Sequence, residues 1–320
     1  MTGESVVGVD IGATSTRAVA VAPDGSVLGR GTSAGANPNS HPPELAGKRV
    51  AEAVAAALGA ADPGGVRHCV LGLAGVSKLS DPDIGAVFED NLHRVGLDCP
   101  VTAVSDAEAA YASATAEPDG TVLVGGTGSI AVRIVARRQA FVVGGYGWLL
   151  GDDGSAFWIG REAVRATLDA VRAGPDIGPL AAAVLTEALG TDAVTEPHDW
   201  RSGTDSRLIT AANAEPPIRL ARFATLVSAH AATDPRAARI VAAAAGHLTD
   251  QALRARSPGA HTPVVLVGSV VGPGSPVGET VRTRLVEHTG DPVLFATDAA
   301  AGAAWLAALK VLGTVPPFRD

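Results

Sequence analysis

Cysteine is nearly absent from this 320-residue chain, which contains only Cys69 and Cys99. Two isolated cysteines provide no disulfide framework, zinc cluster or iron–sulfur signature, so we interpret both as buried small hydrophobic residues. Aromatic residues make up only 4% of the chain, and no apolar run is long enough to span a bilayer. The N-terminus has neither the basic nor the apolar region of a secretory signal. We therefore expect a soluble cytoplasmic protein.

Positive charge is also scarce. The chain has 25 Lys and Arg against 33 Asp and Glu, a net charge of −8. This balance argues against nucleic acid or an anionic membrane surface as the main partner. Small and apolar residues dominate instead, with 47% hydrophobic residues and 38 glycines. The composition indicates a globular chain, long enough for two domains and a large core.

The segment Val6–Thr16, VVGVDIGATST, organises the first half. It predicts a strand that carries one acid, Asp10, and ends in a tight turn at Gly12 and Thr14. Backbone amides and hydroxyls in such a turn can hold phosphate oxygens, and the acid beside them can hold Mg²⁺ through water. An ordinary hairpin with an acid at the end of a strand is the alternative interpretation.

Strands and helices alternate through the rest of the first half. Asp24-Gly25 predicts a hairpin turn, and the loop Thr32–Pro43 carries Asn37, whose amide could bind sugar hydroxyls. From the residues alone, a turn-forming role for Asn37 is the better interpretation. The expected strands and helices are Arg17–Val21, Val27–Gly31, Glu44–Ala60, Val66–Leu73, Asp81–Val95 and Val101–Val104.

Ser105–Glu108 matches a capping box, S-x-x-E, at the start of an alanine-rich helix. The capping box explains Ser105 and Glu108 completely. It leaves Asp106 either as an acid favoured by the helix dipole or as a carboxylate at the mouth of a parallel sheet. In the second case Asp106 could accept a proton from a substrate hydroxyl.

The turn cluster Glu117–Gly120 predicts a domain boundary, giving domains 1–118 and 119–320. The opening pattern then returns, with three strands followed by helices alternating with strands. We infer a duplicated α/β fold whose two domains bind a nucleotide in the cleft between them. The expected elements of the second half are Thr121–Val124, Ile130–Ala136, Ala140–Val143, Val264–Val267, Gly278–His288, Pro292–Phe295 and Asp298–Lys310.

A second turn that could bind phosphate, GGTGS, lies at Gly125–Ser129. Its small residues let backbone amides approach an anion, and Thr127 adds a hydroxyl. No P-loop motif is present, and GPGSPVG at Gly272–Gly278 is an imperfect match to the dinucleotide fingerprint. Gly268-Ser269, after a buried strand, could meet a flat ligand such as adenine, although a simple turn explains it equally well.

The segment Gly144–Gly160, GGYGWLLGDDGSAFWIG, concentrates six glycines, four aromatic residues and the pair Asp152-Asp153. Structure alone rarely requires this combination, so we interpret the segment as a ligand site. Aromatic rings can stack on the faces of a sugar, and carboxylates can accept hydrogen bonds from its hydroxyls.

Several of these motifs resemble known proteins. DIGATST, GGTGSI, LVGSV and the duplication are similar to the actin-like ATPase and sugar kinase superfamily. SDAEAAYASA, GGTGS and GGYGWLLGDDGSAFWIG resemble, more narrowly, the N-acetylglucosamine kinases of the BadF-type ATPase family. The resemblance implies a duplicated ribonuclease H-like fold, ATP with Mg²⁺, and phosphoryl transfer to the 6-hydroxyl of the sugar. It also implies a homodimer.

The resemblance assigns a role to individual residues. Asp106 would be the general base, and Asp10 would orient hydrated Mg²⁺. The phosphates would lie along Gly12 and Thr14 in one turn and along Gly126, Thr127 and Gly128 in the other, and the adenosine would lie near Gly268 and Ser269. The sugar would contact Asn37, Asp106, Gly145, Tyr146, Gly147 and Asp152.

Three positions depart from the family pattern. Ala74 stands where the mammalian enzyme has Ser, Asp153 replaces the usual Glu, and Tyr146 replaces the usual Trp. These changes leave the exact amino sugar open: N-acetylglucosamine, glucosamine or a muramic acid derivative. Two other classes are an ATPase activator of a radical dehydratase, which needs cluster cysteines that this chain lacks, and a non-catalytic sugar sensor.

Overall fold

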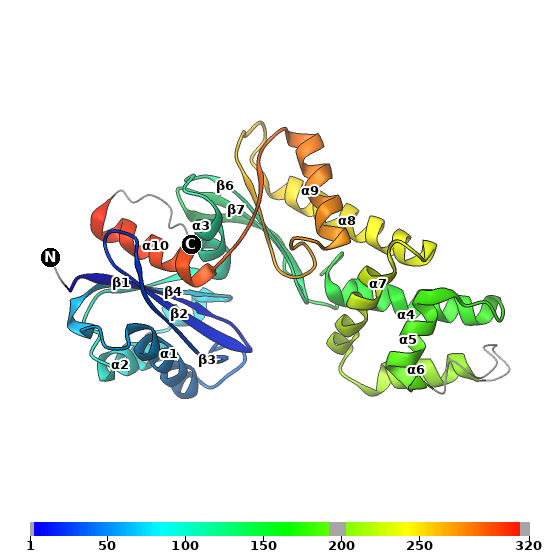
Figure 1. Ribbon diagram of the computed structural model, residues 1–320, viewed down its shortest axis with the longest axis horizontal. Coiled ribbons are helices and arrows are strands. Elements are labelled where there is room, and N and C mark those ends of the chain that lie inside the picture. The colour runs from blue at the N-terminus through cyan, green and yellow to red at the C-terminus, as the bar shows by residue number, and fades with distance from the viewer. Residues whose placement is uncertain (1–2, 192–202, 314–320) are drawn as a thin grey trace. The chain divides into compact units, whose positions relative to one another are not determined.

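The computed structural model describes residues 3–191 and 203–313. The chain forms two compact units, each built around one five-stranded sheet (Figure 1). The first unit consists of Met1–Gly120, Ile134–Ala140 and Ala296–Asp320. The second consists of Thr121–Arg133 and Phe141–Phe295.

The sheet of the first unit has the strand order β3-β2-β1-β4-β5. Strands β1, β2 and β3 form an antiparallel meander, whereas β1, β4 and β5 run parallel, so their carboxyl ends lie at one edge. Local chemistry specifies the hairpins: Gly12 N donates to Ser15 O at 2.9 Å, and Ser26 N donates to Asp24 Oδ1 at 2.9 Å. The strands are β1 (Ser5–Ile11), β2 (Ser15–Val21), β3 (Val27–Ala34), β4 (Val66–Leu73) and β5 (Val101–Ser105).

Helices cover both faces of this sheet (Figure 1). Alternate residues of the strands point to opposite faces. One set forms a core with α1 (Pro43–Leu58) and α2 (Pro82–Arg94). The other set forms a core with α3 (Asp106–Ala114) and α10 (Ala299–Leu312). Two short 3₁₀ helices, η1 (Pro63–Gly65) and η2 (Val76–Ser80), flank β4.

Glycine lets α10 approach the sheet and α3 closely. A Cβ atom at Gly8 of β1 would lie 2.0 Å from Ala304 N, and one at Gly302 would lie 2.1 Å from Ala109 O. Both contacts are with backbone atoms, which cannot turn away as a side chain can. The abundance of small residues in this chain therefore serves close packing of backbone on backbone.

The two units divide the chain differently from the single boundary near residue 118 that we predicted. Helix α10 belongs to the first unit, and so does the hairpin tip Ile134–Ala140 between β7 and β8. The buried side chains Ala300, Ala303 and Trp305 of α10 complete the first-unit core. The order of the elements along the chain does not show that α10 returns to the first unit. That return depends on which face of the first sheet the other helices leave uncovered.

The second sheet has the order β10-β9-β6-β7-β8, which matches the first sheet when it is read from β8. Strand β9 runs parallel to both β6 and β10, as β4 does to β1 and β5. The predicted duplicated α/β fold is therefore confirmed. The strands are β6 (Gly120–Gly125), β7 (Ser129–Val135), β8 (Arg138–Gly144), β9 (Val264–Val267) and β10 (Val293–Phe295).

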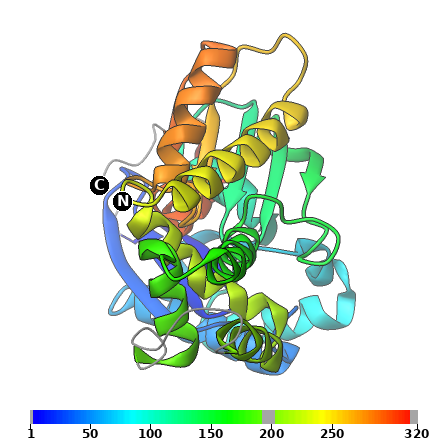
Figure 2. The same cartoon turned by 90° about the vertical axis from the view of Figure 1, so that its right-hand side faces the viewer.

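The second unit contains more helix than the first. Helix α4 lies at the centre of the second-unit core, and α8 packs against α9 (Figure 2). No helix among the described residues is long and apolar enough to cross a membrane. The helices are α4 (Ala156–Ala173), α5 (Gly178–Leu189), α6 (Thr204–Ala214), η4 (Pro217–Phe223), α7 (Ala224–His230), α8 (Pro235–Ala255) and α9 (Pro276–Thr289).

Candidate functional site

In the first unit, Asp10 lies near the carboxyl end of β1, directly before the turn Gly12–Ser15. Burial raises the pKa of the Asp10 carboxyl. Arg17, its partner across the β1–β2 ladder, lowers that pKa, while Asp106 and Asp298 raise it. Three acids therefore share one electrostatic environment at this edge of the sheet.

Asp106 occupies the first turn of α3, and the predicted capping box is present. Ser105 Oγ accepts a hydrogen bond from Glu108 N at 3.2 Å, and Glu108 Oε2 accepts one from Ser105 N at 2.8 Å. Burial raises the pKa of the Asp106 carboxyl, a hydrogen bond from Ala107 N lowers it, and Glu108 raises it. A carboxylate with raised proton affinity is suited to general base catalysis.

Glu108 does more than cap the helix. Its Oε1 accepts a hydrogen bond from Gln139 N at 2.7 Å, and its side chain is 7% exposed. Glu108 therefore connects the start of α3, where Asp106 lies, to the tip of the β7–β8 hairpin. The sequence explained Glu108 by the capping box alone and gave no sign of this second contact.

Asp298, which the sequence predicts only as the start of a helix, is a third acid near this edge. Its Oδ1 accepts hydrogen bonds from Ala300 N at 3.0 Å and Ala301 N at 3.3 Å, and Arg30 donates to its Oδ2. Because Asp298 also raises the pKa of Asp10, it belongs to the same group of acids. In the sequence, an acid before an alanine-rich run indicates an N-cap and nothing more.

Asn37 fastens the loop between β3 and α1 to the first turn. Asn37 N donates to Gly12 O at 3.2 Å, and its Nδ2 donates to Ala74 O at 3.1 Å. Its Oδ1 accepts from Asn39 N at 2.8 Å. The side chain is 5% exposed, but an amide can form further hydrogen bonds beyond these two. Asn37 is thus both a structural residue and a candidate ligand-binding residue.

The first turn is held from the same loop at Ala13. His41 Nε2 lies 2.8 Å from Ala13 O. A Cβ atom at Gly35 would lie 1.9 Å from the same oxygen, so only glycine fits there. Thr14, the next residue, is exposed, and its hydroxyl is free to approach a ligand. Neither Gly35 nor His41 was predicted from the sequence as a site residue.

In the second unit, the turn Gly125–Ser129 is supported by the N-terminus of α4. Ala156 N donates to Gly126 O at 2.9 Å, and Phe157 N donates to Thr127 O at 3.2 Å. Within the described residues, no hydrogen-bond acceptor engages the amides of Thr127 and Gly128. Those two amides remain available for an anion.

Asp152 braces this second turn. It has a left-handed backbone conformation with φ of 59°, and its Oδ1 accepts a hydrogen bond from Ser129 N at 3.0 Å. A Cβ atom at Gly128 would lie 2.9 Å from the Asp152 carboxylate oxygens, so glycine makes this contact possible. The motifs GGTGS and GDDG are separated in sequence, but they contact each other directly in the second unit.

A polar cavity of about 200 Å³ lies beside this structure. The predicted residues Tyr146 and Asp152 line it, and Tyr146 is 62% exposed. Gly145 and Gly147, on either side of Tyr146, both have positive φ, 72° and 78°. The cavity is also lined by four residues of α8 that we did not predict: His247, Asp250, Gln251 and Arg254.

Those four α8 residues follow the spacing i, i+3, i+4 and i+7, which places them on one helix face. Gln251 Nε2 donates to Val143 O at 3.0 Å and to Ser129 O at 3.4 Å. The polar stripe is visible in the sequence as HLTDQALR. Only the fold shows that it faces the glycine-rich segment, which is about a hundred residues earlier in the chain.

Gly268 and Ser269 follow β9 and lie next to the second turn. Gly268 has φ of 100°, and a Cβ atom there would lie 2.5 Å from Gly125 O. Val270 N donates to the same oxygen at 2.9 Å. The predicted adenosine residues and the second predicted phosphate turn are therefore neighbours within the second unit.

The acids near the first turn fit a weakly held magnesium ion and not a site in which the protein supplies most of the metal ligands. Among the described residues, no group of three or more His, Cys, Asp or Glu side chains is arranged to hold a metal. Mg²⁺ in phosphoryl-transfer sites is commonly held by one or two carboxylates together with water and phosphate oxygens. Asp10, a partly buried carboxylate beside a turn that can bind phosphate, provides that chemistry.

The predicted residues form two groups, one in each unit. Asp10, Gly12, Thr14, Asn37 and Asp106 lie at or beside the carboxyl edge of the first sheet. The second group surrounds the turn after β6 and comprises Gly126, Thr127, Gly128, Gly145, Tyr146, Gly147, Asp152, Gly268 and Ser269.

The sequence profile of the BadF/BadG/BcrA/BcrD ATPase family matches residues 7–307. An N-acetylmuramic acid/N-acetylglucosamine kinase of Clostridium acetobutylicum is 33% identical over 98 residues, which is 31% of this chain and 31% of that protein. The alignment thus spans less than a third of the relative.

Solved structures share the fold. A candidate N-acetylglucosamine kinase from Chromobacterium violaceum superposes with a TM-score of 0.70 and 24% identity, covering 96% of this chain and 100% of that one. Another from Porphyromonas gingivalis gives a TM-score of 0.68 and 21% identity, covering 97% and 100%.

Proposed function

Because the chain belongs to the BadF/BadG/BcrA/BcrD ATPase family, we propose that it is an ATP-dependent amino-sugar kinase that phosphorylates the 6-hydroxyl of N-acetylglucosamine. The observation that carries this proposal is the placement of Asp106 beside Asp10 and the first turn. Burial raises the pKa of both carboxyls, and Asp10 lies next to a turn that can bind phosphate.

In the proposed reaction, the sugar hydroxyl oxygen bonds to the γ-phosphorus of ATP, and the bond to the β–γ bridging oxygen breaks. ADP leaves, and the Asp106 carboxylate takes the hydroxyl proton. Bound Mg²⁺ would neutralise phosphate charge and would be held through water by Asp10. The amides of Thr127 and Gly128 would bind phosphate oxygens, and Asn37 and Asp152 would orient the sugar.

Three amino sugars are candidate substrates. The Clostridium relative is named for both N-acetylmuramic acid and N-acetylglucosamine, so N-acetylmuramic acid is a second substrate to test. Glucosamine is a third, because Asp152, Asp153 and Asp250 around the polar cavity could bind an ammonium group. The predicted homodimer stays a prediction.

A coupled ADP-release assay with Mg·ATP tests this function. N-acetylglucosamine, N-acetylmuramic acid, glucosamine, N-acetylmannosamine and glucose would be compared. We expect turnover to be fastest with N-acetylglucosamine and to rise with pH as Asp106 loses its proton, at a pKa above the ordinary value of an aspartate. No turnover with any of these sugars would contradict the proposal and favour a sensor.

The variant Asp106→Asn tests the general base, because it keeps the shape of the side chain and removes the base. We expect its kcat to fall about 10²- to 10⁴-fold while ATP binding, measured by calorimetry, stays unchanged. Full activity in this variant would remove Asp106 from the proposed mechanism and leave the kinase activity itself intact.

A further inference from the structure

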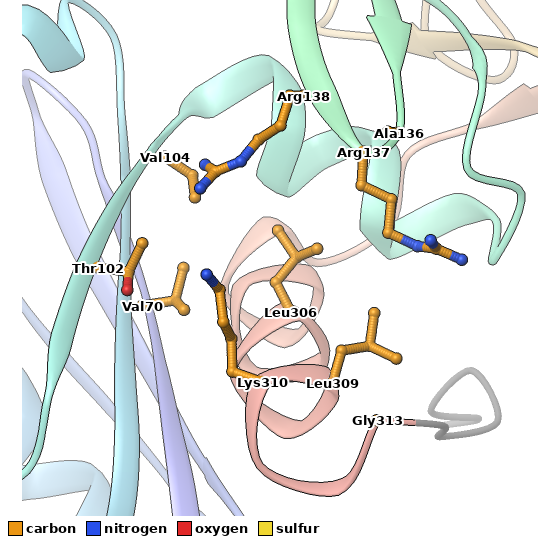
Figure 3. Close-up of a pocket in the computed structure, with 10 residues that line it drawn as sticks. All are labelled: Val70, Thr102, Val104, Ala136, Arg137, Arg138, Leu306, Leu309, Lys310 and Gly313. Atoms are coloured by element: carbon orange, nitrogen blue, oxygen red, sulfur yellow. The ribbon is translucent and has the colours of Figure 1, made fainter.

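A second cavity lies in the first unit, where β4 and β5 face the C-terminal part of α10 (Figure 3). Its volume is about 290 Å³, the lower end of the range for small-molecule sites. Val70 and Val104 from the sheet and Leu306 and Leu309 from α10 give it an apolar wall. The tip of the β7–β8 hairpin and Lys310 complete it.

The charge of this cavity is opposite to that of the protein. The whole chain carries a net charge of −8. Three cations nevertheless line the cavity: Arg137, Arg138 and Lys310. No acid is among the described residues that line it. A concentration of positive charge in an acidic protein attracts anions to that position.

Two of the three cations form no hydrogen bond among the described residues, and Arg138 forms only a long ion pair with Glu108. Within the described residues, neither the Arg138 guanidinium nor the Lys310 ammonium donates a hydrogen bond. Both side chains extend toward the side of the cavity where Thr102 and Val104 lie (Figure 3). Arg137 is turned away, because it donates to Ala116 O at 2.8 Å and lies 5.5 Å from the Trp305 ring.

The neighbouring titratable groups leave the cavity positive. Two acids lie near it: Glu108 Oε2 forms an ion pair with Arg138 at 3.8 Å, and Asp119 Oδ1 accepts a hydrogen bond from Ala136 N at 2.7 Å. The three cations that line the cavity outnumber these two acids. His68 Nε2 lies 2.9 Å from Thr102 Oγ1. Burial, and then Lys310, lower the pKa of His68, which favours its neutral form and so leaves Lys310 as the charge on that side.

We propose that this cavity binds a small organic anion. Its acidic group, a phosphate or a carboxylate, would be held by Arg138 and Lys310 with the Thr102 hydroxyl beside them. Its apolar body would lie on Leu306, Leu309 and the two valines. The combination of charge-assisted hydrogen bonds with an apolar wall selects ligands that have both parts. This inference does not depend on the proposed kinase activity.

Calorimetric titration with simple probes tests the proposal. Phenyl phosphate and benzoate carry the two possible acidic groups, benzyl alcohol has a similar apolar body without charge, and inorganic phosphate has charge without the body. All titrations would contain saturating Mg·ADP, which would occupy the predicted nucleotide residues. We expect phenyl phosphate or benzoate to bind, and whichever binds more tightly identifies the acidic group. Benzyl alcohol and inorganic phosphate should bind at least about tenfold more weakly.

Variants assign the binding to this cavity. Lys310→Gln and Arg138→Gln should each weaken the better probe about tenfold. Lys48→Gln, which removes an exposed cation from α1, is the matched control and should leave affinity unchanged. Circular dichroism would establish that each variant is folded. The proposal is overturned if neither acidic probe binds at about 10 mM, if benzyl alcohol binds equally well, or if both cavity variants bind like the control.

Discussion

The two halves of this protein have the same strand order but different chemistry at the turn after the first strand. In the first half, Asp10 stands two residues before Gly12. In the second half, Val124 stands two residues before Gly126. The first turn therefore has a carboxylate beside it, whereas the second turn has an apolar side chain at the equivalent place.

The two turns are also supported differently. Loop residues support the first, because Gly12 O and Ala13 O accept hydrogen bonds from the segment between β3 and α1. A helix N-terminus and the Asp152 carboxylate support the second. Duplication has preserved the topology while the first turn supplies negative charge and the second supplies two backbone amides that no acceptor among the described residues engages. The same fold therefore carries two turns of different chemistry, one in each unit.

Asp10→Asn tests the charged half of this comparison and has the largest expected effect among the variants that probe the two turns. An amide of equal size cannot orient hydrated Mg²⁺ as a carboxylate does, so we expect kcat/KM to fall about 10- to 100-fold and the Mg²⁺ requirement to increase. Steady-state rates over a Mg²⁺ titration measure both. Asp24→Asn, in the exposed β2–β3 hairpin, is the control, and an unaltered Mg²⁺ profile in Asp10→Asn would contradict the assigned role.

The same variant makes a prediction about stability. Because burial raises the pKa of Asp10 in the folded state, the folded chain holds that proton more tightly than the unfolded chain. The stabilisation is full below the ordinary pKa and is lost as the pH rises through the raised one. Asp10→Asn should therefore melt at a higher temperature than the natural chain at about pH 7, and the difference should shrink toward about pH 4.

Most of the fold could be predicted from the sequence because the signals are local. β-Branched runs, the Asp24-Gly25 turn and the capping box at Ser105 each act within a few residues, and the family and the duplication were predicted correctly. The placement of α10 in the first unit could not be predicted. It depends on a long-range contact between Gly8 and Ala304 that no local pattern encodes.

The candidate site shows the same limit. Glycine-rich segments and acids at strand ends are visible in the sequence, so residues such as Asp106 and Asp152 could be selected. His41, Asp298 and the polar face of α8 could not, because each matches an ordinary loop, cap or surface pattern. Their importance comes from what the fold places beside them.

Substitutions at two glycines of the second turn separate ligand contact from structural support of the turn. A Cβ atom at Gly126 would meet nothing within 4 Å, whereas one at Gly128 would lie 2.9 Å from Asp152. We expect Gly126→Ala to leave the melting temperature unchanged and to raise KM for ATP about fivefold. Gly128→Ala should instead destabilise the fold by about 1–3 kcal/mol. Equal effects of the two variants on the melting temperature would contradict the assignment of ligand contact to Gly126 and of structural support to Gly128.

His41→Ala tests how the first turn is held and has the smallest expected effect. Arg49 Nη1 can only donate toward His41 Nδ1, at 3.4 Å, and Ala13 O can only accept, so the Nε2 atom carries the proton. Losing this hydrogen bond frees the turn, and we expect KM for ATP to rise about two- to threefold with kcat unchanged. His41→Gln, which retains a donor, should restore part of the affinity, whereas His93→Ala on α2 should do nothing. A fall in kcat alone would mean that His41 supports the acids and not the turn.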